Sequence, residues 1–486
     1  MVFSFGPFQL DPATRRLTRD GAAVAVADRH LDVLVHLVSH PGELLSKDAL
    51  VAAAWQDVAV TDNSLEQAVS ALRRIVGVDD DGRPLIQTVP RRGYRFAGSV
   101  ARTARRESDD DLEALLAPHR AFLEGRTAVE TLDRDQILVA QRAFARAVTA
   151  APDDAPAHVG LANAEILRFE STRADDTPAV DAVAAAVHHA REACRLDAAS
   201  AEAWATLGMA LNRGGDAMKA LAAARRAVAL EPENWKHHLR LAFVGWGEER
   251  LRAADRTLKL LPGIALAHWL AATVHVARQA FDAAARELDA GAAAQDAQGT
   301  APTRFGGVGL HWLRGLLRLE RGDVDGARDD FERELSFEQS GHLYARECCA
   351  NTWYALGALQ LREGNRSAAL DAFAQSLQRV NGHAIALAAD AALRDDAEAD
   401  VRRGRLAQRV AQLRSRGSAL EAALAEAVHA ALRDEATRAV ALLQDAVVQS
   451  DRVGSLWLLP IEPVLHTSTA PREWSPVLTA LRTRSA

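Results

Sequence analysis

Apolar and polar residues alternate over the first 26 positions of the chain, and turn-forming pairs interrupt the alternation. The apolar positions are Phe3, Phe5, Phe8, Leu10, Leu17, Val24 and Val26, and the pairs are Gly6-Pro7, Asp11-Pro12 and Asp20-Gly21. Alternation with a period of two between turn signals is typical of β-strands. The pattern therefore predicts a small antiparallel meander.

Three amphipathic segments follow, with apolar residues at the spacing of one helix face. The first two begin near Asp28 and at Ser46. The third is capped by Asp62 or Asn63, closes at Gly77, and has its apolar positions at Leu65, Val69, Leu72 and Val76. Residues 85–98 then predict a β-hairpin. Strands, three helices and a hairpin, in this order, predict a winged helix (α+β) over residues 1–101.

Beyond residue 111 the chain repeats itself with a period of about 34 residues. The clearest unit, residues 201–234, matches the tetratricopeptide signature at Trp204, Leu207, Gly208, Leu211, Ala220, Ala224, Ala227 and Pro232. Further units begin near residues 235, 265, 308 and 350. Small residues at fixed positions of each unit let two antiparallel helices approach closely. Residues 112–486 are therefore predicted to form an α-solenoid of about seven or eight helix pairs.

Composition agrees with a mainly α chain of several domains. Of the 486 residues, 49% are hydrophobic, and alanine is abundant throughout the predicted solenoid. The charged stretch 102–111 has no periodicity and is predicted to be a linker. Residues 1–106 hold 14 Lys and Arg against 12 Asp and Glu, whereas the whole chain has a net charge of −7. This mild excess of positive charge does not by itself indicate DNA binding.

Several classes of function find no support in the sequence. There is no export signal, no apolar run long enough to span a membrane, and no set of four metal ligands. The signatures of phosphate-binding loops, serine hydrolases, zinc proteases and dinucleotide folds are also absent. With three cysteines, two of them adjacent, we expect no disulfide framework. We therefore expect a cytoplasmic protein that is not an enzyme and needs no cofactor, metal or membrane.

Four linked stretches of the first domain resemble the OmpR/PhoB family of bacterial winged-helix transcription regulators. They are Pro41 to Ser46, Leu50 with Trp55, Val69 to Arg74, and Thr88 to Phe96. In that family the third helix lies in the major groove, the wing contacts the adjacent minor groove, and the loop between the second and third helices can contact RNA polymerase. The resemblance therefore implies double-stranded promoter DNA as a partner and RNA polymerase as a second one. That loop holds Asp57, Val58 and Ala59, whereas Trp55 is expected in the core.

The outward face of the third helix agrees with this implication, because its residue types suit base edges and phosphates. We expect Asn63, Gln67 and Ser70 near bases. Arg73 and Arg74 are expected on phosphates or one guanine, and Ala71 beside a thymine methyl. The full candidate set is Asn63, Ser64, Gln67, Ser70, Ala71, Arg73, Arg74, Thr88, Arg91, Arg92 and Arg95. The wing departs from the family at Pro90, where several members carry arginine.

The order of the two domains resembles CadC-like and HilA-like regulators, in which a sensing or assembly domain follows the DNA-binding domain. In tetratricopeptide proteins the first helix of each pair lines a concave wall. The positions that face inward there correspond to Arg213, Phe243, Trp246, Trp269, Trp312, Tyr354 and Arg362. They predict a groove for a peptide, a protein or a small-molecule effector, and packing against neighbouring helices is an alternative of equal weight. Histidines at the fourth position of several units, His158, His238, His268 and His311, are expected to be structural.

Together these patterns favour a sequence-specific transcription regulator in signal transduction, an effector domain of the phosphorelay family type controlled by a solenoid. It would act as a dimer or pair on direct repeats. The alternative is a scaffold or adaptor in which the solenoid carries the main activity and the winged helix binds protein. Steep salt dependence of DNA binding distinguishes the regulator from the scaffold.

Overall fold

The computed structural model describes residues 2–55, 62–79, 82–103, 109–130, 133–298, 307–394, 397–449, 456–465, 467 and 471–486. These residues are mainly α-helical, and they divide into two compact units. The first unit comprises Met1–Val129, Ile137–Ile166 and Ala182–Arg240, and the second Glu130–Gln136, Leu167–Asp181 and Leu241–Ala486. The division falls inside the predicted solenoid. The predicted domain boundaries therefore stay predictions.

A five-stranded antiparallel sheet opens the chain, in the order β4-β3-β2-β1-β7. Its strands are β1 Val2–Phe5, β2 Phe8–Asp11, β3 Arg16–Arg19, β4 Ala22–Val24 and β7 Ala101–Thr103. The first four confirm the predicted meander. The last pairs Val2 with Thr103 and enters the predicted linker, while the helix α4 begins at Asp109. Both ends of the stretch predicted as a linker, 102–111, thus lie in regular secondary structure, and the linker itself stays a prediction.

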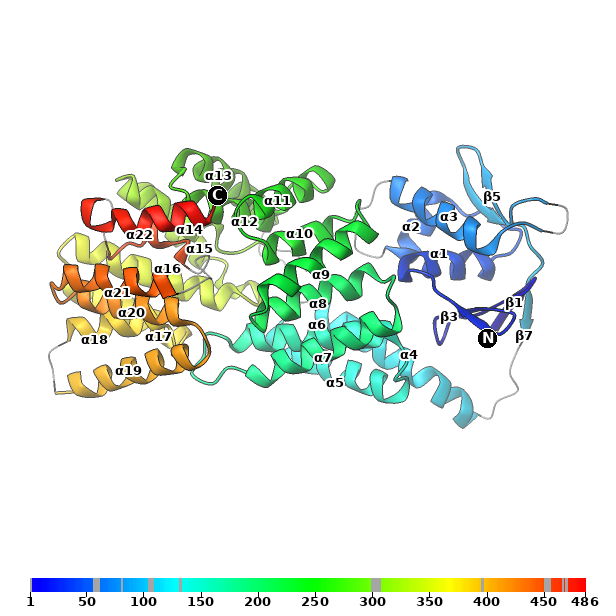
Figure 1. The fold of residues 1–486 in the computed structure, drawn as a ribbon, viewed down its shortest axis with the longest axis horizontal. Helices are drawn as coiled ribbons and strands as arrows, with labels where there is room; N and C mark the ends of the chain where they lie inside the picture. Colours follow the sequence, from blue (N-terminus) through cyan, green and yellow to red (C-terminus); the bar gives the residue numbers. More distant parts are fainter. Residues whose placement is uncertain are drawn as a thin grey trace. The chain divides into compact units, whose positions relative to one another are not determined.

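Three helices and a hairpin complete the winged helix, as predicted. They are α1 Asp28–Ser39, α2 Lys47–Ala54, α3 Asp62–Val76, and the wing strands β5 Ile86–Val89 and β6 Gly93–Phe96 (Figure 1). Ser46 caps α2, since its hydroxyl accepts a hydrogen bond from the amide of Ala49. The Phe5 and Phe96 rings meet edge-on with centroids 5.1 Å apart, so β1 and the wing share one core.

Antiparallel helices make up most of the remaining described residues (Figure 1). In order they are α4 Asp109–Glu130, α5 Arg134–Ala150, α6 Ala155–Thr172, α7 Val180–Leu196, α8 Ala201–Arg213, α9 Ala217–Leu230, α10 Trp235–Val244, α11 Glu248–Leu260, α12 Ala265–Ala277, α13 Phe281–Gln298, α14 Leu310–Glu320, α15 Val324–Leu335, α16 Ala345–Arg362, α17 Arg366–Arg379, α18 Ala384–Leu393, α19 Ala399–Ser415, α20 Ala419–Ala431, α21 Ala436–Gln449 and α22 Pro471–Arg484. The five clear repeats correspond to the pairs from α8/α9 to α16/α17. The predicted α-solenoid of tetratricopeptide-like pairs is confirmed, and α18/α19 extends it.

Glycines at the eighth position of a repeat explain the close approach of the paired helices. A Cβ added to Gly315 would lie 2.6 Å from the Phe331 ring, and one added to Gly357 would lie 2.5 Å from the Phe373 ring. Phe331 and Phe373 are completely buried. Glycine is therefore required at these positions because the aromatic ring of the second helix fills the space.

In the second unit the chain returns to the solenoid wall after α21. The segment Leu456–Leu465, which contains the short 3-10 helix η3 Leu459–Ile461, contacts α12 and α14. The helix α22 then packs on α21 and reaches α12. In the part of the chain that the structure describes, no helix has the length and apolar character needed to cross a membrane.

Candidate DNA interface and solenoid groove

The helix α3 buries one face and exposes the opposite one. Leu65, Leu72 and the other predicted inward positions, Val69 and Val76, are at most 4% exposed. Gln67, Ser70 and Arg74 are exposed, and Ser64, Ala71 and Arg73 are half-buried. Lys47 of α2 contacts Glu66 of α3 with Nζ and Oε1 2.8 Å apart. The exposed face therefore presents an amide, a hydroxyl and a guanidinium, and the opposite face of the helix is buried in the core of the domain.

Arg73 joins α3 to the wing. Its Nε donates a hydrogen bond to the carbonyl oxygen of Ile86 at 2.8 Å, and its Nη2 donates to Oγ1 of Thr88 at 2.6 Å. On the same hairpin, Arg95 donates to Oε1 of Gln87 at 2.8 Å. The sequence predicts that Arg73 contacts phosphate or guanine. In the structure its two bonds hold the wing against α3, which is a positioning role that the sequence did not predict. That second role follows from pairing between distant residues, which the helical pattern alone does not contain.

The wing tip is fixed to the segment before α2. The amides of Leu45 and Tyr94 each donate to the other's carbonyl at 2.9 Å. Gly93 has a φ of +138°, and a Cβ there would lie 1.9 Å from the carbonyl oxygen of Leu45. Arg91, with a φ of +61°, and Arg92 are exposed at the tip. The hairpin therefore holds two cationic side chains outward beside α3.

Some predicted residues lie outside the described parts of the structure. Asp57, Val58 and Ala59 belong to residues 56–61, and the side chain of Asn63 is likewise outside them. Trp55, which precedes this loop, is 7% exposed, which confirms its expected place in the core. Thr88 is exposed on β5.

An exposed polar helix face next to a cationic hairpin, on a winged-helix scaffold, defines a DNA-binding domain. Residues 21–96 match the family model described as "Transcriptional regulatory protein, C terminal". The amino-terminal part of the chain is therefore a DNA-binding domain of the OmpR/PhoB type. The predicted resemblance is confirmed for this part of the chain.

Two transcription regulators are similar to this domain. The transcriptional activator CadC of Escherichia coli (strain K12) is 31% identical over 110 residues, which are 22% of this chain and 22% of CadC. The transcriptional regulator HilA of Salmonella typhimurium (strain LT2) is 38% identical over 80 residues, 16% of this chain and 14% of HilA. The solved DNA-binding domain of Escherichia coli CadC is 31% identical, with 21% of this chain and 96% of that chain covered and a TM-score of 0.20. The chain thus matches less than a quarter of the length of CadC and HilA.

In the second unit, the predicted aromatic wall is occupied by the chain itself. The ring of Trp457 meets that of Trp269 edge-on, with centroids 5.5 Å apart. The Tyr354 hydroxyl donates to Oε1 of Glu462 at 2.7 Å, and Nη2 of Arg362 donates to the carbonyl of Pro463 at 3.1 Å. We call residues 456–465 the groove segment. Tyr354 and Trp312 are 3% and 7% exposed.

Glu462 anchors the groove segment from within. Its second carboxylate oxygen accepts hydrogen bonds from the amides of Val464 at 2.9 Å and Leu465 at 2.7 Å. Burial raises the pKa of Glu462, and the hydrogen bond from Tyr354 together with the two amides opposes this rise. Burial also lowers the pKa of Arg362, whose other amino group donates to the carbonyl of Leu319.

The remaining wall residues have other surroundings. Trp246 lies under the guanidinium of Arg250, which is 4.7 Å from the ring centroid, and Arg250 also donates to the carbonyl oxygen of Phe243. Arg213 is half-buried on α8, in the first unit. The structure therefore brings Trp269, Trp312, Tyr354 and Arg362 together around one segment. Trp246 has a cation-π contact with Arg250, which bonds to Phe243 through the backbone carbonyl of Phe243.

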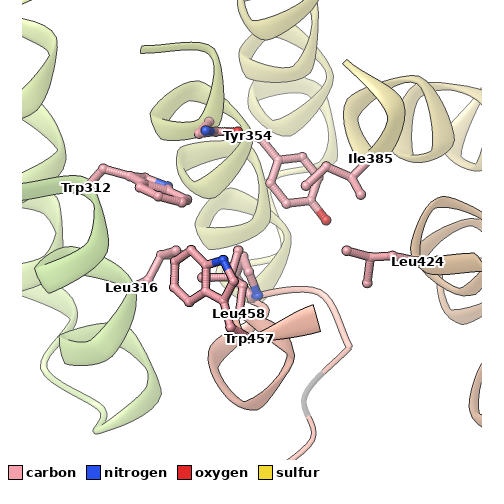
Figure 2. A pocket seen from close by; sticks show the side chains of 9 residues that line it. Trp312, Leu316, Tyr354, Ile385, Leu424, Trp457 and Leu458 are labelled. Atoms are coloured by element: carbon pink, nitrogen blue, oxygen red, sulfur yellow. The ribbon is translucent and has the colours of Figure 1, made fainter. Parts of the chain in front are cut away.

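A cavity of about 180 Å³ remains between the solenoid wall and the groove segment (Figure 2). It is lined by Trp312, Leu316, Asn351, Tyr354, Ile385, Leu424, Trp457, Leu458 and Pro463. In Figure 2 the rings of Trp312, Tyr354 and Trp457 surround the space from different elements. Of these nine residues, the repeat positions predict only Trp312 and Tyr354. An apolar run without repeat periodicity, residues 456–465, was the available signal for the groove segment.

The histidines at the fourth repeat position have the structural surroundings expected of them. His158 and His238 each contact a proline carbonyl oxygen six residues earlier, at 3.0 and 2.9 Å. His268 contacts Glu287, and His311 contacts Asp330. Among the described residues, no group of three or more potential ligands is placed to hold a metal ion.

Proposed function

We propose that this protein is a sequence-specific, double-stranded-DNA-binding transcription regulator whose solenoid is its effector or partner domain. One observation carries the proposal: α3 turns Gln67, Ser70 and Arg74 outward while its opposite face is buried. On a domain of this family, such a face supplies donors and acceptors for base edges. The proposed place of action is the cytoplasm, where bacterial promoter DNA lies.

In this proposal the contacts fall into two groups. Asn63, Ser64, Gln67 and Ser70 contact base edges in the major groove, and Ala71 meets a thymine methyl. Arg73 and Arg74 hold phosphates or one guanine, and the wing residues Thr88, Arg91, Arg92 and Arg95 hold phosphates or the adjacent minor groove. RNA polymerase as a partner, through residues 57–59, and pairing of two copies on DNA belong to the same proposal.

A scaffold or adaptor is the second candidate, and one observation favours it. Arg73 and Arg95 both use their guanidinium groups within the domain, which leaves a modest cationic surface. In that case the winged helix would bind protein and the solenoid would carry the main activity.

Selection of genomic fragments by the full chain, followed by titration of a selected duplex at several salt concentrations, tests the proposal. A regulator shows a preferred sequence and a steep fall of affinity with salt. Gln67→Ala should reduce the preference by about tenfold or more, because a bidentate base contact contributes about 1–3 kcal/mol. A flat salt dependence without a preferred sequence would support the scaffold instead.

Two arginines of the same domain provide a matched control. Arg92 is exposed at the wing tip, and Arg16 is exposed on β3. Arg92→Ala should lower the salt slope by about one, as expected for one lost phosphate contact. Arg16→Ala removes the same charge elsewhere and should leave the slope unchanged. Equal slopes for the two variants would show that the wing does not contact DNA.

A further inference from the structure

The cavity beneath the groove segment has the character of a small-ligand site. Its volume is about 180 Å³. A dry apolar cavity of roughly 150 Å³ in another protein binds benzene. The present cavity therefore has room for one aromatic ring with a short substituent.

The lining of the cavity selects against charge. Its side chains are apolar or aromatic apart from the Asn351 amide and the Tyr354 hydroxyl, and that hydroxyl already donates to Glu462. A charged ligand would lose its hydration without meeting an ion of opposite sign among the lining residues. The rings of Trp312 and Trp457, by contrast, offer faces and edges to another ring.

Asn351 supplies one directed polar group, and its orientation follows from His383. The Nδ1 atom of His383 accepts a hydrogen bond from the amide of Ala386 at the start of α18. Burial lowers the pKa of His383 to about 4, so the ring is neutral at pH 7 and its proton lies on Nε2. Nε2 then donates to Oδ1 of Asn351 at 2.8 Å. The amide group of Asn351 is thereby oriented with its nitrogen as the remaining donor.

No described residue accepts a hydrogen bond from Nδ2 of Asn351 in the structure. A ligand in the cavity that carries a carbonyl or ether oxygen would supply that acceptor. We propose that the cavity binds a small, uncharged aromatic compound of one ring, or two fused rings, with its hydrogen-bond acceptor on Asn351 Nδ2.

Such a ligand would contact the solenoid wall and the groove segment at once, since Trp457, Leu458 and Pro463 belong to the segment. A ligand bound to both stabilises the docked segment by mass action. Its role as the effector of transcription rests on the proposed function. Its binding does not.

Isothermal titration of the full chain, without DNA, tests the site with acetophenone as the probe and benzoate as its charged counterpart. Acetophenone should bind at least about tenfold more tightly than benzoate. Slower hydrogen exchange of the Val464 and Leu465 amides in its presence would place the probe beneath the segment. Equal affinities, or exchange that acetophenone leaves unchanged, would overturn the proposal.

Two variants locate the contact. Asn351→Asp keeps an acceptor for His383 but removes the Nδ2 donor, and it should weaken acetophenone binding by at least about tenfold. Leu424→Trp fills the cavity and should abolish binding, and Ile385→Phe serves the same purpose if Leu424→Trp does not fold. Unchanged acetophenone affinity in a folded cavity-filling variant would overturn the proposal. Failure of DNA binding with intact acetophenone binding would reject the proposed function and leave this inference standing.

Discussion

The guanidinium of Arg73 on α3 donates a 2.6 Å hydrogen bond to the hydroxyl oxygen of Thr88 on the wing. A second bond, from its Nε to the carbonyl of Ile86, fixes the plane of the group. The helix proposed to enter the major groove and the hairpin proposed to probe the minor groove are thus one rigid body at their junction. Their spacing is set before DNA is met, which reduces the ordering that binding requires.

Arg73→Lys should loosen this junction although it keeps the charge. A lysine ammonium cannot reproduce the two directed bonds of a planar guanidinium, and we expect a loss of about 2 kcal/mol in the stability of the winged helix. Hydrogen exchange of the wing amides measures it. Arg74→Lys, on the exposed face of the same helix turn, is the control and should change this exchange little; equal effects of the two would argue against a positioning role for Arg73.

Gly93→Ala should displace the wing. The added Cβ would lie 1.9 Å from the carbonyl oxygen of Leu45, at a φ of +138°. We expect a cost of about 3 kcal/mol or more, from backbone strain and steric overlap together. Gly82 also has a positive φ, +76°, but a Cβ there meets nothing within 4 Å.

Gly82→Ala is therefore the matched control, with an expected cost of about 1 kcal/mol from its backbone conformation alone. Exchange of the Leu45 and Tyr94 amides, which bond to each other, measures both variants. If these amides exchange as slowly in the Gly93→Ala variant as in the Gly82→Ala variant, the close approach of Gly93 to Leu45 does not constrain the wing.

Tyr354→Phe should destabilise the groove segment more at pH 8 than at pH 5. Burial raises the pKa of Glu462 in the folded state, so stability from this group is present below its ordinary pKa and is lost as pH rises through the folded value. Removing the Tyr354 hydroxyl raises that pKa further and enlarges the loss. The expected penalty grows from about 1 kcal/mol at pH 5 to about 2 kcal/mol at pH 8.

Denaturant unfolding at the two pH values measures the penalty. In a Glu462→Gln background the carboxyl group is absent, so Tyr354→Phe should show the same penalty at both pH values. A pH dependence that persists in that background would assign it to another group.

Trp457→Ala should release the groove segment from the wall. It removes the edge-on contact with Trp269, which contributes about 1 kcal/mol beyond the buried area. Exchange of the Val464 and Leu465 amides should then accelerate by about tenfold or more. Trp204 belongs to the first unit, where its indole nitrogen donates to the carbonyl of Ala198, so Trp204→Ala is the control. Exchange that responds equally to both changes would contradict a specific role for Trp457.

Local patterns predicted the parts of the fold that local physics determines. The apolar spacing of α3 depends on residues within a turn or two of each other, and the predicted inward positions are buried. The second helix was predicted to begin at Ser46, and the structure begins it at Lys47 with Ser46 as its cap. The strand β7 was missed because it pairs with β1, about 100 positions earlier in the chain. Its three residues have no alternation long enough to detect.

The candidate groove shows the same limit. Repeat positions predicted that Trp269 and Tyr354 share a wall, since equivalent positions of a solenoid face the same side. The bond between Tyr354 and Glu462 joins residues 108 positions apart, and no repeat includes Glu462. What fills the groove therefore depended on tertiary packing, which the repeat pattern does not encode.

The last helix of the chain changes how this solenoid is expected to unfold. A solenoid held only by contacts between neighbouring repeats can lose its helix pairs one after another from either end. Here Arg278, directly after α12, donates to the carbonyl oxygen of Ser485, 207 positions away. In addition, Trp457 of the groove segment contacts Trp269 of α12. These ties span the repeats between them, so the second unit should melt in a single cooperative transition.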